Sequence, residues 1–409
     1  MKKQAFWLIT GLVVLSTLTA AAAYPEKEKK AKVSPGIEVL IEKKRFLKGK
    51  KVGLITNPTG VNAELTSSID LLYQDRDIEL TALFGPEHGV RGDAQAGDEV
   101  ESYIDEKTGL PVYSLYGDTK KPTPEMLKNV DVLLFDIQDV GTRFYTYIYT
   151  MAYAMEAAKE NDIPFIVLDR PNPQSGTKVE GPVLDPDYSS FIGRYPIPLI
   201  HGMTAGELAK FFTREFDIGA DLTVIKMKGW KRKMFFEDTG LPFVLPSPNM
   251  PTADTSIVYP GTGLIEGTNV SEGRGTTKPF ELIGAPYMKS TELADKLNSL
   301  KLPGVVFRAA SFTPTFSKHQ NKLCHGVELY VKNRTAFQPV KTGIAIIKTI
   351  HDLYPNDFEF LPNSHFNRLI GNGWVKTMIE QGASLDDTVA KYEAEQKRFM
   401  NVRNKYLLY

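Results

Sequence analysis

The sequence predicts an α/β protein, with a doubly wound, mostly parallel sheet followed by a second, smaller α+β domain. Apolar runs of strand length alternate with helical patterns from residue 50 to residue 227, and this alternation is typical of a parallel sheet. One of the runs, "VDVLLFDI", is continuously apolar, as expected for a strand covered on both faces. The chain has 409 residues. A single hydrophobic core usually does not extend over a chain of this length, so we expect two domains.

The predicted elements of the first domain follow in order along the chain. The strands are "KKVGLIT" (50–56), "IELTALF" (78–84), "VDVLLFDI" (130–137), "IPFIVLD" (163–169) and "LTVIKM" (222–227). The helices are "AELTSSIDLLY" (63–73), "RFYTYIYTMAYAMEAAKEN" (143–161) and "TAGELAKFFTREF" (204–216). The last helix begins with Thr204 and has Glu207 three residues later, which predicts a capping box.

The second domain is predicted from a further helix near 290–300, strands at 304–312 and 326–332, and a helix at 340–354. We therefore expect a Rossmann-like domain over 36–280 and an auxiliary α+β domain over 281–409. The connecting stretch "GTGLIEGTNVSEGRG" (261–275) has five glycines, which allow a backbone to approach a ligand closely. It is predicted to be a ligand loop, with an interdomain linker as the alternative.

The first 23 residues have the pattern of a secretory signal peptide. Lys2 and Lys3 precede an apolar stretch, and a run of alanines precedes Tyr24, where cleavage is expected. An uncleaved membrane anchor is the alternative. Residues 24–35 are charged and read as a flexible leader, so the mature protein is expected to be secreted or periplasmic. The single cysteine, Cys324, excludes an internal disulfide and is expected to be a core residue.

Composition and motifs exclude several classes of function. The 49 basic and 49 acidic residues balance, which gives no general attraction to nucleic acid or to an anionic membrane. The sequence has no HExxH motif, no paired cysteines, no GxGxxG after the first strand and no GxSxG. We therefore expect no cofactor and no nucleic-acid partner. A metal site made by Glu87, His88, Asp136 and Asp139 remains an alternative.

Polar, glycine-rich and proline-rich loops follow four of the predicted strands. They are "NPTGV" (57–61), "GPEHGVRGD" (85–93), "DIQDVGTRFYTY" (136–147) and "DRPNP" (169–173). In open α/β sheets, ligands bind beyond the carboxyl ends of the strands, so we expect these loops to form the site.

Carboxylates are the candidate catalytic groups. Glu87 lies two residues past a buried strand, where partial desolvation would raise its pKa and suit it to general acid catalysis. Glycoside hydrolysis typically needs two carboxyls. Asp136 is the candidate partner that we single out. The other candidates are Asp139, Asp169, Glu180, Glu266 and Glu272.

Aromatic residues near these loops favour a sugar ligand, because the faces of aromatic rings pack on the apolar faces of sugars. The candidates are Phe144, Tyr145, Tyr147, Tyr149, Tyr259 and Tyr287. Some of them must instead pack in the core, since four of them share one predicted helix.

Several motifs together resemble the exo-β-N-acetylmuramidase family of the NamZ type. They include "GLITNPTGV", "LFGPEHGVRGDAQAGDEV", "LLFDIQDVGTRFYTYIYTMAYAMEAA", "VLDRPNP", "PIPLIHGMTAGELA" and "PSPNMPTADTSIVYPGTGLIEGTNVSEGRGTT", and the likeness runs from about residue 36 to the C-terminus. The resemblance implies a secreted glycosidase of cell-wall recycling that releases N-acetylmuramic acid from the non-reducing end of peptidoglycan fragments. It also implies that Glu87, in the PEHG motif, is the general acid/base. The second carboxylate and the stereochemical outcome stay open.

We expect the glycan to be bound by side chains of the polar loops and of the glycine-rich stretch. These are Asn57, His88, Arg91, Asp139, Arg143, Tyr145, Arg170, Asn172, Glu180, His201, Asn249, Glu266, Asn269, Glu272 and Arg274. The lactyl carboxylate of muramic acid is expected to pair with Arg143, Arg170 or Arg274. Two alternatives remain: a non-catalytic protein that binds peptidoglycan fragments, and a metal-dependent hydrolase on the same fold.

Overall fold

The structure is a computed structural model that describes residues 32–92 and 102–409. The predicted signal peptide, most of the predicted leader and Asp93 of the PEHG loop lie outside these ranges. The helices are α1 Gly36–Lys43, α2 Ser68–Tyr73, α3 Pro124–Leu127, α4 Tyr147–Glu160, α5 Ala205–Glu215, α6 Phe236–Thr239, α7 Ala253–Thr262, α8 Ser290–Ser299, α9 Pro339–Leu353, α10 His365–Ile370, α11 Trp374–Glu380 and α12 Leu385–Arg403, with 3₁₀ turns η1 Lys44–Leu47, η2 Pro186–Tyr188 and η3 Gly263–Gly267. The strands are β1 Lys51–Thr56, β2 Glu79–Gly85, β3 Tyr103–Ile104, β4 Pro111–Ser114, β5 Val132–Asp136, β6 Phe165–Leu168, β7 Glu180–Val183, β8 Pro198–Ile200, β9 Leu222–Ile225, β10 Leu282–Ala285, β11 Val305–Phe312 and β12 Cys324–Val331.

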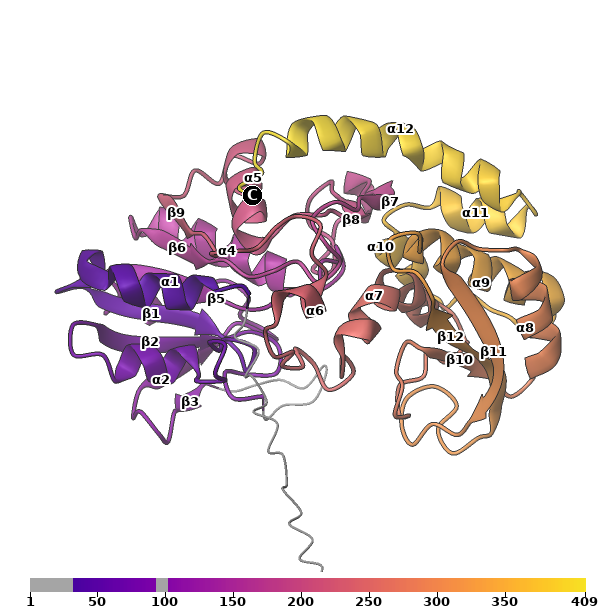
Figure 1. Ribbon diagram of the computed structural model, residues 1–409, viewed down its shortest axis with the longest axis horizontal. Helices are drawn as coiled ribbons and strands as arrows, with labels where there is room; N and C mark the ends of the chain where they lie inside the picture. The colour runs from indigo at the N-terminus through magenta and orange to yellow at the C-terminus, as the bar shows by residue number, and fades with distance from the viewer. Residues whose placement is uncertain (1–31, 93–101) are drawn as a thin grey trace, which may run out of the picture. The chain divides into compact units, whose positions relative to one another are not determined.

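The predicted fold class is confirmed. The main sheet has seven strands in the order β3-β4-β2-β1-β5-β6-β9, and every pair is parallel except β3 with β4 (Figure 1). β2 and β5 flank the central strand β1, so the winding direction changes there. The loops after β1 and β5 therefore begin at the topological switch point, where ligands bind in open α/β sheets.

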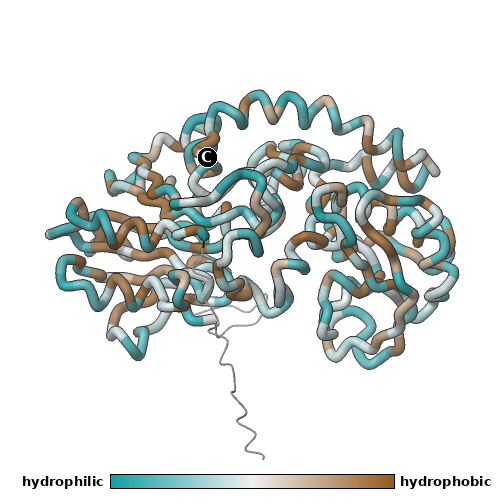
Figure 2. The backbone as a smooth tube through the Cα atoms, viewed as in Figure 1, coloured by the Kyte–Doolittle hydropathy of each residue, from teal (hydrophilic) through white to brown (hydrophobic). Residues whose placement is uncertain are grey.

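Alternating residues of the main sheet face two separate cores. Val52, Val132 and Ile166 belong to the core under α1 and α2. Leu133 and Phe165 belong to the core under α4 and α5. The period of two follows from strand geometry, and it explains why these strands are apolar throughout. Figure 2 shows the resulting hydrophobic colouring along the strands of the sheet.

The smaller sheet is antiparallel, with the order β10-β12-β11. Its core includes Leu293 and Leu297 of α8 and Ile344 and Ile347 of α9. Cys324 begins β12 and is fully buried, in agreement with its predicted place in the core. Within the described ranges, no helix combines the length and apolarity that a membrane crossing requires.

Three predicted elements differ from the structure. The helix predicted from residue 63 begins only at Ser68, because the Ser67 side chain accepts a hydrogen bond from the Ile69 amide and caps α2 there. The helix predicted from residue 143 begins at Tyr147, because the Arg143 amide bonds to the Leu199 carbonyl instead. The glycine-rich stretch is partly helical: Gly261 lies in the last turn of α7, where a Cβ would collide with the Pro339 carbonyl at the crossing with α9.

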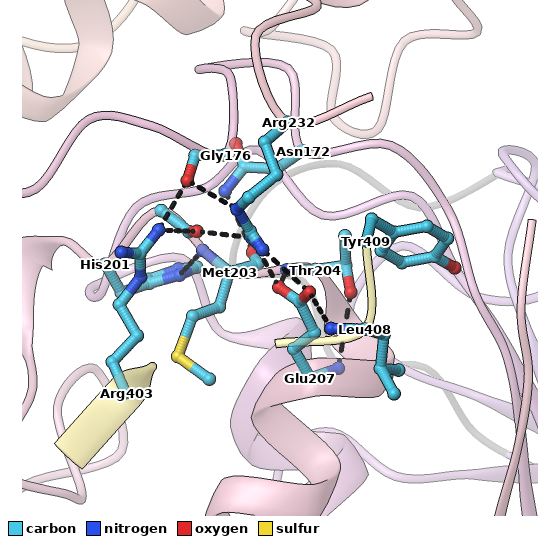
Figure 3. A network of polar contacts seen from close by, with 12 residues as sticks. Asn172, Gly176, His201, Met203, Thr204, Glu207, Arg232, Arg403, Leu408 and Tyr409 are labelled. Atoms are coloured by element: carbon cyan, nitrogen blue, oxygen red, sulfur yellow. Dashed lines mark hydrogen bonds and ion pairs between the residues drawn. The ribbon is translucent and has the colours of Figure 1, made fainter. Parts of the chain in front are cut away.

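The last six residues follow α12 and join a buried polar network with residues of α5 and of the segments after β6 and β9 (Figure 3). The Leu408 amide donates to Glu207 Oε1 at 2.7 Å. The Tyr409 hydroxyl donates to Asp169 Oδ2 at 2.8 Å and accepts from the Met227 amide at 2.8 Å. We refer to residues 404–409 as the C-terminal latch.

Glu207 is the centre of the network that the latch joins. It completes the predicted capping box with Thr204 at the start of α5, so that prediction is confirmed. It also forms an ion pair with Arg232 at 2.8 Å. The Arg403 guanidinium donates to the carbonyls of Gly176 and Gly202, which also accept hydrogen bonds from Arg232. The end of α12 is therefore bound to the loops after β6 and β8 (Figure 3). Each of these bonds satisfies a group that burial would otherwise leave unpaired.

Replacing Tyr409 with Phe should lower the free energy of unfolding by about 1–3 kcal/mol, because the Met227 amide and Asp169 each lose a buried partner. Urea unfolding of both proteins measures this difference. Tyr73→Phe is the matched control, since Tyr73 is 47% exposed, and it should stay within about 0.5 kcal/mol of the parent. Equal stability of the Tyr409→Phe variant and the parent would show that the latch hydroxyl is not a structural contact.

Candidate active site

Glu87 lies at the rim of the main sheet because the chain reverses immediately after β2. The Gly89 amide bonds to the Pro86 carbonyl at 3.0 Å, and His88 has a φ of 75°. A non-glycine residue in this left-handed region stores about 1–2 kcal/mol of strain. His88 is buried and Glu87 is half-buried, so the tight turn directs the glutamate outward.

Hydroxyl groups from two other loops contact the Glu87 carboxylate. The Thr146 hydroxyl donates to Glu87 Oε2 at 3.3 Å. Tyr116, which follows β4, also hydrogen-bonds to Glu87, and burial together with the Glu87 charge raises the pKa of Tyr116 to about 12. Glu87 is thus a carboxylate with hydroxyl donors on two sides at the edge where ligands are expected.

Three tyrosine rings extend from Glu87 towards α7. The Tyr145 ring packs edge-on against Tyr147 at 5.1 Å and against Tyr259 at 5.8 Å, measured between ring centroids. Burial raises the pKa of Tyr145 and Tyr259 well above the ordinary value, with smaller contributions from the Glu87 charge. The phenols therefore stay neutral and offer hydroxyl groups and apolar ring faces, both of which suit a sugar.

Asp139, in the loop after β5, is a buried carboxyl group without a cationic partner in the part of the chain that the structure describes. Its Oδ2 accepts a hydrogen bond from the Gly141 amide at 2.6 Å. Its Oδ1 is shielded from solvent and has no partner among the described residues. Burial raises the pKa of Asp139 to about 7, although the Gly141 and Val140 amides act in the opposite direction. Asp139 is therefore partly protonated at neutral pH.

Other buried polar atoms near Asp139 also lack good hydrogen bonds within the described ranges. The Thr142 hydroxyl has no partner there. The Asn57 amide nitrogen and the Tyr145 hydroxyl lie beside the Tyr147 hydroxyl without a bond of good geometry, and Tyr147 donates to the Pro246 carbonyl. Buried polar groups are normally satisfied, so these open groups at the carboxyl edge of the sheet are available to a polar ligand.

Asp136 and Arg170 form a buried ion pair at the same edge. Arg170 Nε and Nη2 lie 2.6 and 2.9 Å from the two carboxylate oxygens. The Ser68 hydroxyl also donates to Asp136, and Arg170 reaches the Val61 carbonyl at 2.8 Å. Both side chains are thus committed to internal contacts, and we do not include Asp136 in the proposed catalytic machinery.

The other arginines expected to bind the glycan differ in their surroundings. Arg143 is fully buried and donates to the carbonyls of Pro182, Ile197 and Leu369, and burial lowers its pKa to about 10. Arg91 is half-buried and pairs with Asp105 at 2.9 Å, which holds the pKa of that carboxyl at about 2. Both have strong internal partners.

Arg274 lies in a cluster of charges next to the tyrosine rings. It pairs with Glu266 at 2.6 Å and with Glu272 at 3.4 Å, and 24% of its side chain is exposed. Lys318 also pairs with Glu272, at 2.9 Å. The charges of Glu266 and Arg274 act on Tyr259 together with those of Glu87 and Asp139, so this cluster borders the same site.

Five expected binding residues make other contacts. Asn172 donates to the Met203 carbonyl, and His201 is buried in the network of Figure 3, where burial lowers its pKa to about 3. Glu180 accepts from the Lys341 amide at 2.9 Å near the start of α9. Asn269 joins the loop at Asp357 through a 2.7 Å hydrogen bond. Asn249 is buried in the turn after Pro246, whose carbonyl accepts a hydrogen bond from the Tyr147 hydroxyl.

Thr142, Thr146 and Tyr116 lie at the site although the sequence did not predict them there. Thr142 and Thr146 lie in the quoted loop after β5, but nothing in their spacing separates them from ordinary helix-start residues. Tyr116 follows β4, which pairs in parallel with β2, so it lies at the same carboxyl edge of the sheet as Glu87. Because ligands bind beyond that edge, Tyr116 could have been predicted as a site residue if β4 had been predicted as a strand. Within residues 32–92 and 102–409, no three His, Cys, Asp or Glu side chains are grouped to hold a metal ion.

Comparison with known proteins covers nearly the whole chain. Residues 52–254 match the model of the N-terminal domain of exo-β-N-acetylmuramidase NamZ, and residues 257–409 match the model of its C-terminal domain. The chain is 69% identical over 414 residues to the peptidoglycan β-N-acetylmuramidase NamZ of Bacillus subtilis, with 100% of each chain covered.

Two crystal structures of DUF1343 family proteins from Bacteroides fragilis are also similar. The first is 41% identical with a TM-score of 0.87, covering 93% of this chain and 100% of the other. The second is 35% identical with a TM-score of 0.76, covering 92% and 99%.

Proposed function

This chain belongs to the NamZ family of exo-β-N-acetylmuramidases, and we propose that it is a glycosidase that releases N-acetylmuramic acid from the non-reducing end of peptidoglycan fragments. Both family models and a relative that is 69% identical over its full length support this activity. The chemistry also fits the carboxyl edge of the sheet, which carries carboxyl groups, neutral tyrosines and buried polar atoms without good partners.

Glu87 is the proposed general acid/base of the reaction. The observation that carries this proposal is its position: a half-buried carboxylate on a strained turn at the sheet edge, next to three tyrosine rings. A residue held in an unfavourable backbone conformation at such an edge is typical of functional sites.

Arg274 is the proposed partner of the lactyl carboxylate. Of the three arginines that the sequence suggested, Arg143 and Arg170 are almost completely buried among internal acceptors. Arg274 keeps part of its guanidinium group exposed and borders Tyr259. A substrate carboxylate would join Glu266 and Glu272 around a cation cluster that already includes Lys318.

Replacing Glu87 with Gln should lower turnover on a natural glycan about 10²–10⁴-fold, because the isosteric amide cannot transfer a proton. Binding of N-acetylmuramic acid, measured by calorimetry, should change little. Glu79→Gln is the matched control, since Glu79 is exposed at the other end of the same strand and should keep full turnover. A Glu87→Gln variant with more than half of the parent turnover would remove Glu87 from the mechanism. A parent protein that binds the fragment but cleaves nothing would favour the non-catalytic alternative.

Cleavage of β-N-acetylglucosaminides should be at least about 10²-fold slower than cleavage of matched β-N-acetylmuraminides. When the lactyl group is absent, the cation that would bind its carboxylate is left without that partner. Arg274→Ala should narrow this ratio, mainly by lowering kcat/KM for the muramic substrate. The exposed Arg76→Ala variant serves as the control and should keep the ratio. Equal rates on both sugars in the parent protein would contradict muramic specificity, whereas an unchanged ratio in Arg274→Ala would contradict only the role of Arg274.

The protein is also proposed to be exported. Residues 1–23 carry the basic start, apolar stretch and small residues that a signal peptidase reads. The mature protein should begin near Tyr24 and accumulate outside the cytoplasmic membrane, which cell fractionation and N-terminal sequencing would measure. Full-length protein in the cytosol would contradict export.

A further inference from the structure

A second carboxyl group lies at the same edge of the main sheet as Glu87. Glu87 follows β2 and Asp139 follows β5, and only β1 lies between these two strands. Neighbouring strands are about 4.8 Å apart, so the two strand ends are roughly 10 Å apart. The charges of both carboxyls act on Tyr145, Tyr147 and Tyr259, which places the two groups around one set of rings. Glycoside hydrolysis typically needs two carboxyl groups that flank the scissile bond.

We propose that Asp139 is the second catalytic carboxyl and that it donates the proton to the glycosidic oxygen, while Glu87 acts as the base. This assignment rests on the proposed glycosidase function and divides its acid and base roles between two residues. The buried Oδ1 of Asp139, which has no partner in the described part of the chain, is the atom that carries the proton.

The surroundings of the two carboxyls fit these separate roles. Asp139 is only 9% exposed, no cation pairs with it among the described residues, and burial raises its pKa to about 7. Asp139 is therefore partly protonated at neutral pH. A catalytic acid is most effective when its pKa lies near the working pH, because it then still carries its proton and can release it readily. Glu87 instead receives hydrogen bonds from Thr146 and Tyr116, as suits a carboxylate that accepts a proton.

The reaction step balances with these two groups and water. The Asp139 O–H bond breaks and its proton goes to the glycosidic oxygen. The bond between C1 and that oxygen breaks, and its electron pair leaves with the departing sugar. Water attacks C1 and gives its proton to the Glu87 carboxylate. The products are free N-acetylmuramic acid and the shortened fragment, and proton exchange with solvent restores both carboxyls.

Asp139 also has a structural contact, and the test must separate it from catalysis. Its Oδ2 accepts from the Gly141 amide, which stabilises the turn after β5. Asp139→Asn keeps a carbonyl oxygen for that amide and removes only the transferable proton. The variant is therefore expected to retain the turn.

The leaving group separates proton donation from other roles. On a disaccharide of N-acetylmuramic acid and N-acetylglucosamine, Asp139→Asn should lower kcat/KM about 10²–10⁴-fold. On 4-nitrophenyl β-N-acetylmuraminide, whose nitrophenolate leaves without protonation, the loss should be less than about 10-fold, since proton donation contributes little there. Glu87→Gln should be impaired on both substrates. The ratio of kcat/KM on the disaccharide to kcat/KM on the nitrophenyl substrate is taken for one variant at a time. A smaller folded fraction of that variant lowers both values equally and does not change the ratio.

The pH dependence gives a second readout. The Asp139 charge acts on the titratable groups Tyr145, which precedes α4; Tyr147 and Tyr149, in the first turn of α4; and Tyr259, in α7. The charge of Glu87, after β2, acts on three of these tyrosines, namely Tyr145, Tyr147 and Tyr259. Burial keeps these tyrosines neutral. A proton donor is active in its protonated form, so kcat/KM of the parent on the disaccharide should fall as pH rises through about 7, the pKa of Asp139. Asp139→Asn should lack this alkaline decline.

Asp131→Asn is the matched control, since Asp131 precedes the amino end of β5 and is exposed, and it should behave as the parent in both measurements. Equal losses on the two substrates, or an alkaline decline that persists in Asp139→Asn, would overturn the role of Asp139. If the parent cleaves neither substrate, the proposed function itself fails, and this outcome is distinct from an active parent with an unimpaired Asp139→Asn variant.

Discussion

The buried ion pair between Asp136 and Arg170 holds the carboxyl edge of the main sheet together. It joins the end of β5 to the loop after β6, and through Ser68 and the Val61 carbonyl it also fixes the start of α2 and the loop after β1. Removing one partner of such a pair typically costs about 3–5 kcal/mol, because the other charge is left buried and unpaired. The ion pair joins loops that leave the carboxyl edge of the main sheet, where the candidate site lies. The geometry of the site therefore depends on this pair.

Two aspartates three residues apart have opposite surroundings as a consequence. Asp136 ends β5 and points at Arg170. Asp139 lies beyond the strand, where the Gly141 amide is its hydrogen-bond donor and burial raises its pKa to about 7. The first carboxyl is thereby held in an ion pair, whereas the second has no cationic partner among the described residues. Environment, and not residue type, separates the two roles.

The C-terminal latch connects the two halves of the described chain through backbone as well as side-chain groups. Leu408 and Tyr409 reach Glu207 and Asp169, and Arg403 reaches the carbonyls after β6 and β8. Asp169 follows β6, which lies next to β5 in the main sheet. The end of the chain therefore stabilises the strand end beside the one from which the Asp139 loop leaves.

The sequence by itself determined the alternation of strands and helices, the mostly parallel sheet, the α5 capping box and the edge at which the functional loops gather. These features follow from local periodicity and from short-range hydrogen bonds, and both depend only on residues that are close together in the chain. The partners of buried charges were decided only by tertiary structure. Nothing near Arg143 in the chain indicates that it donates to the Leu369 carbonyl, and Asp136 and Asp139 look alike until Arg170 pairs with one of them. Burial and ion pairing depend on residues far apart in the chain, and these contacts set the acidity of a carboxyl group.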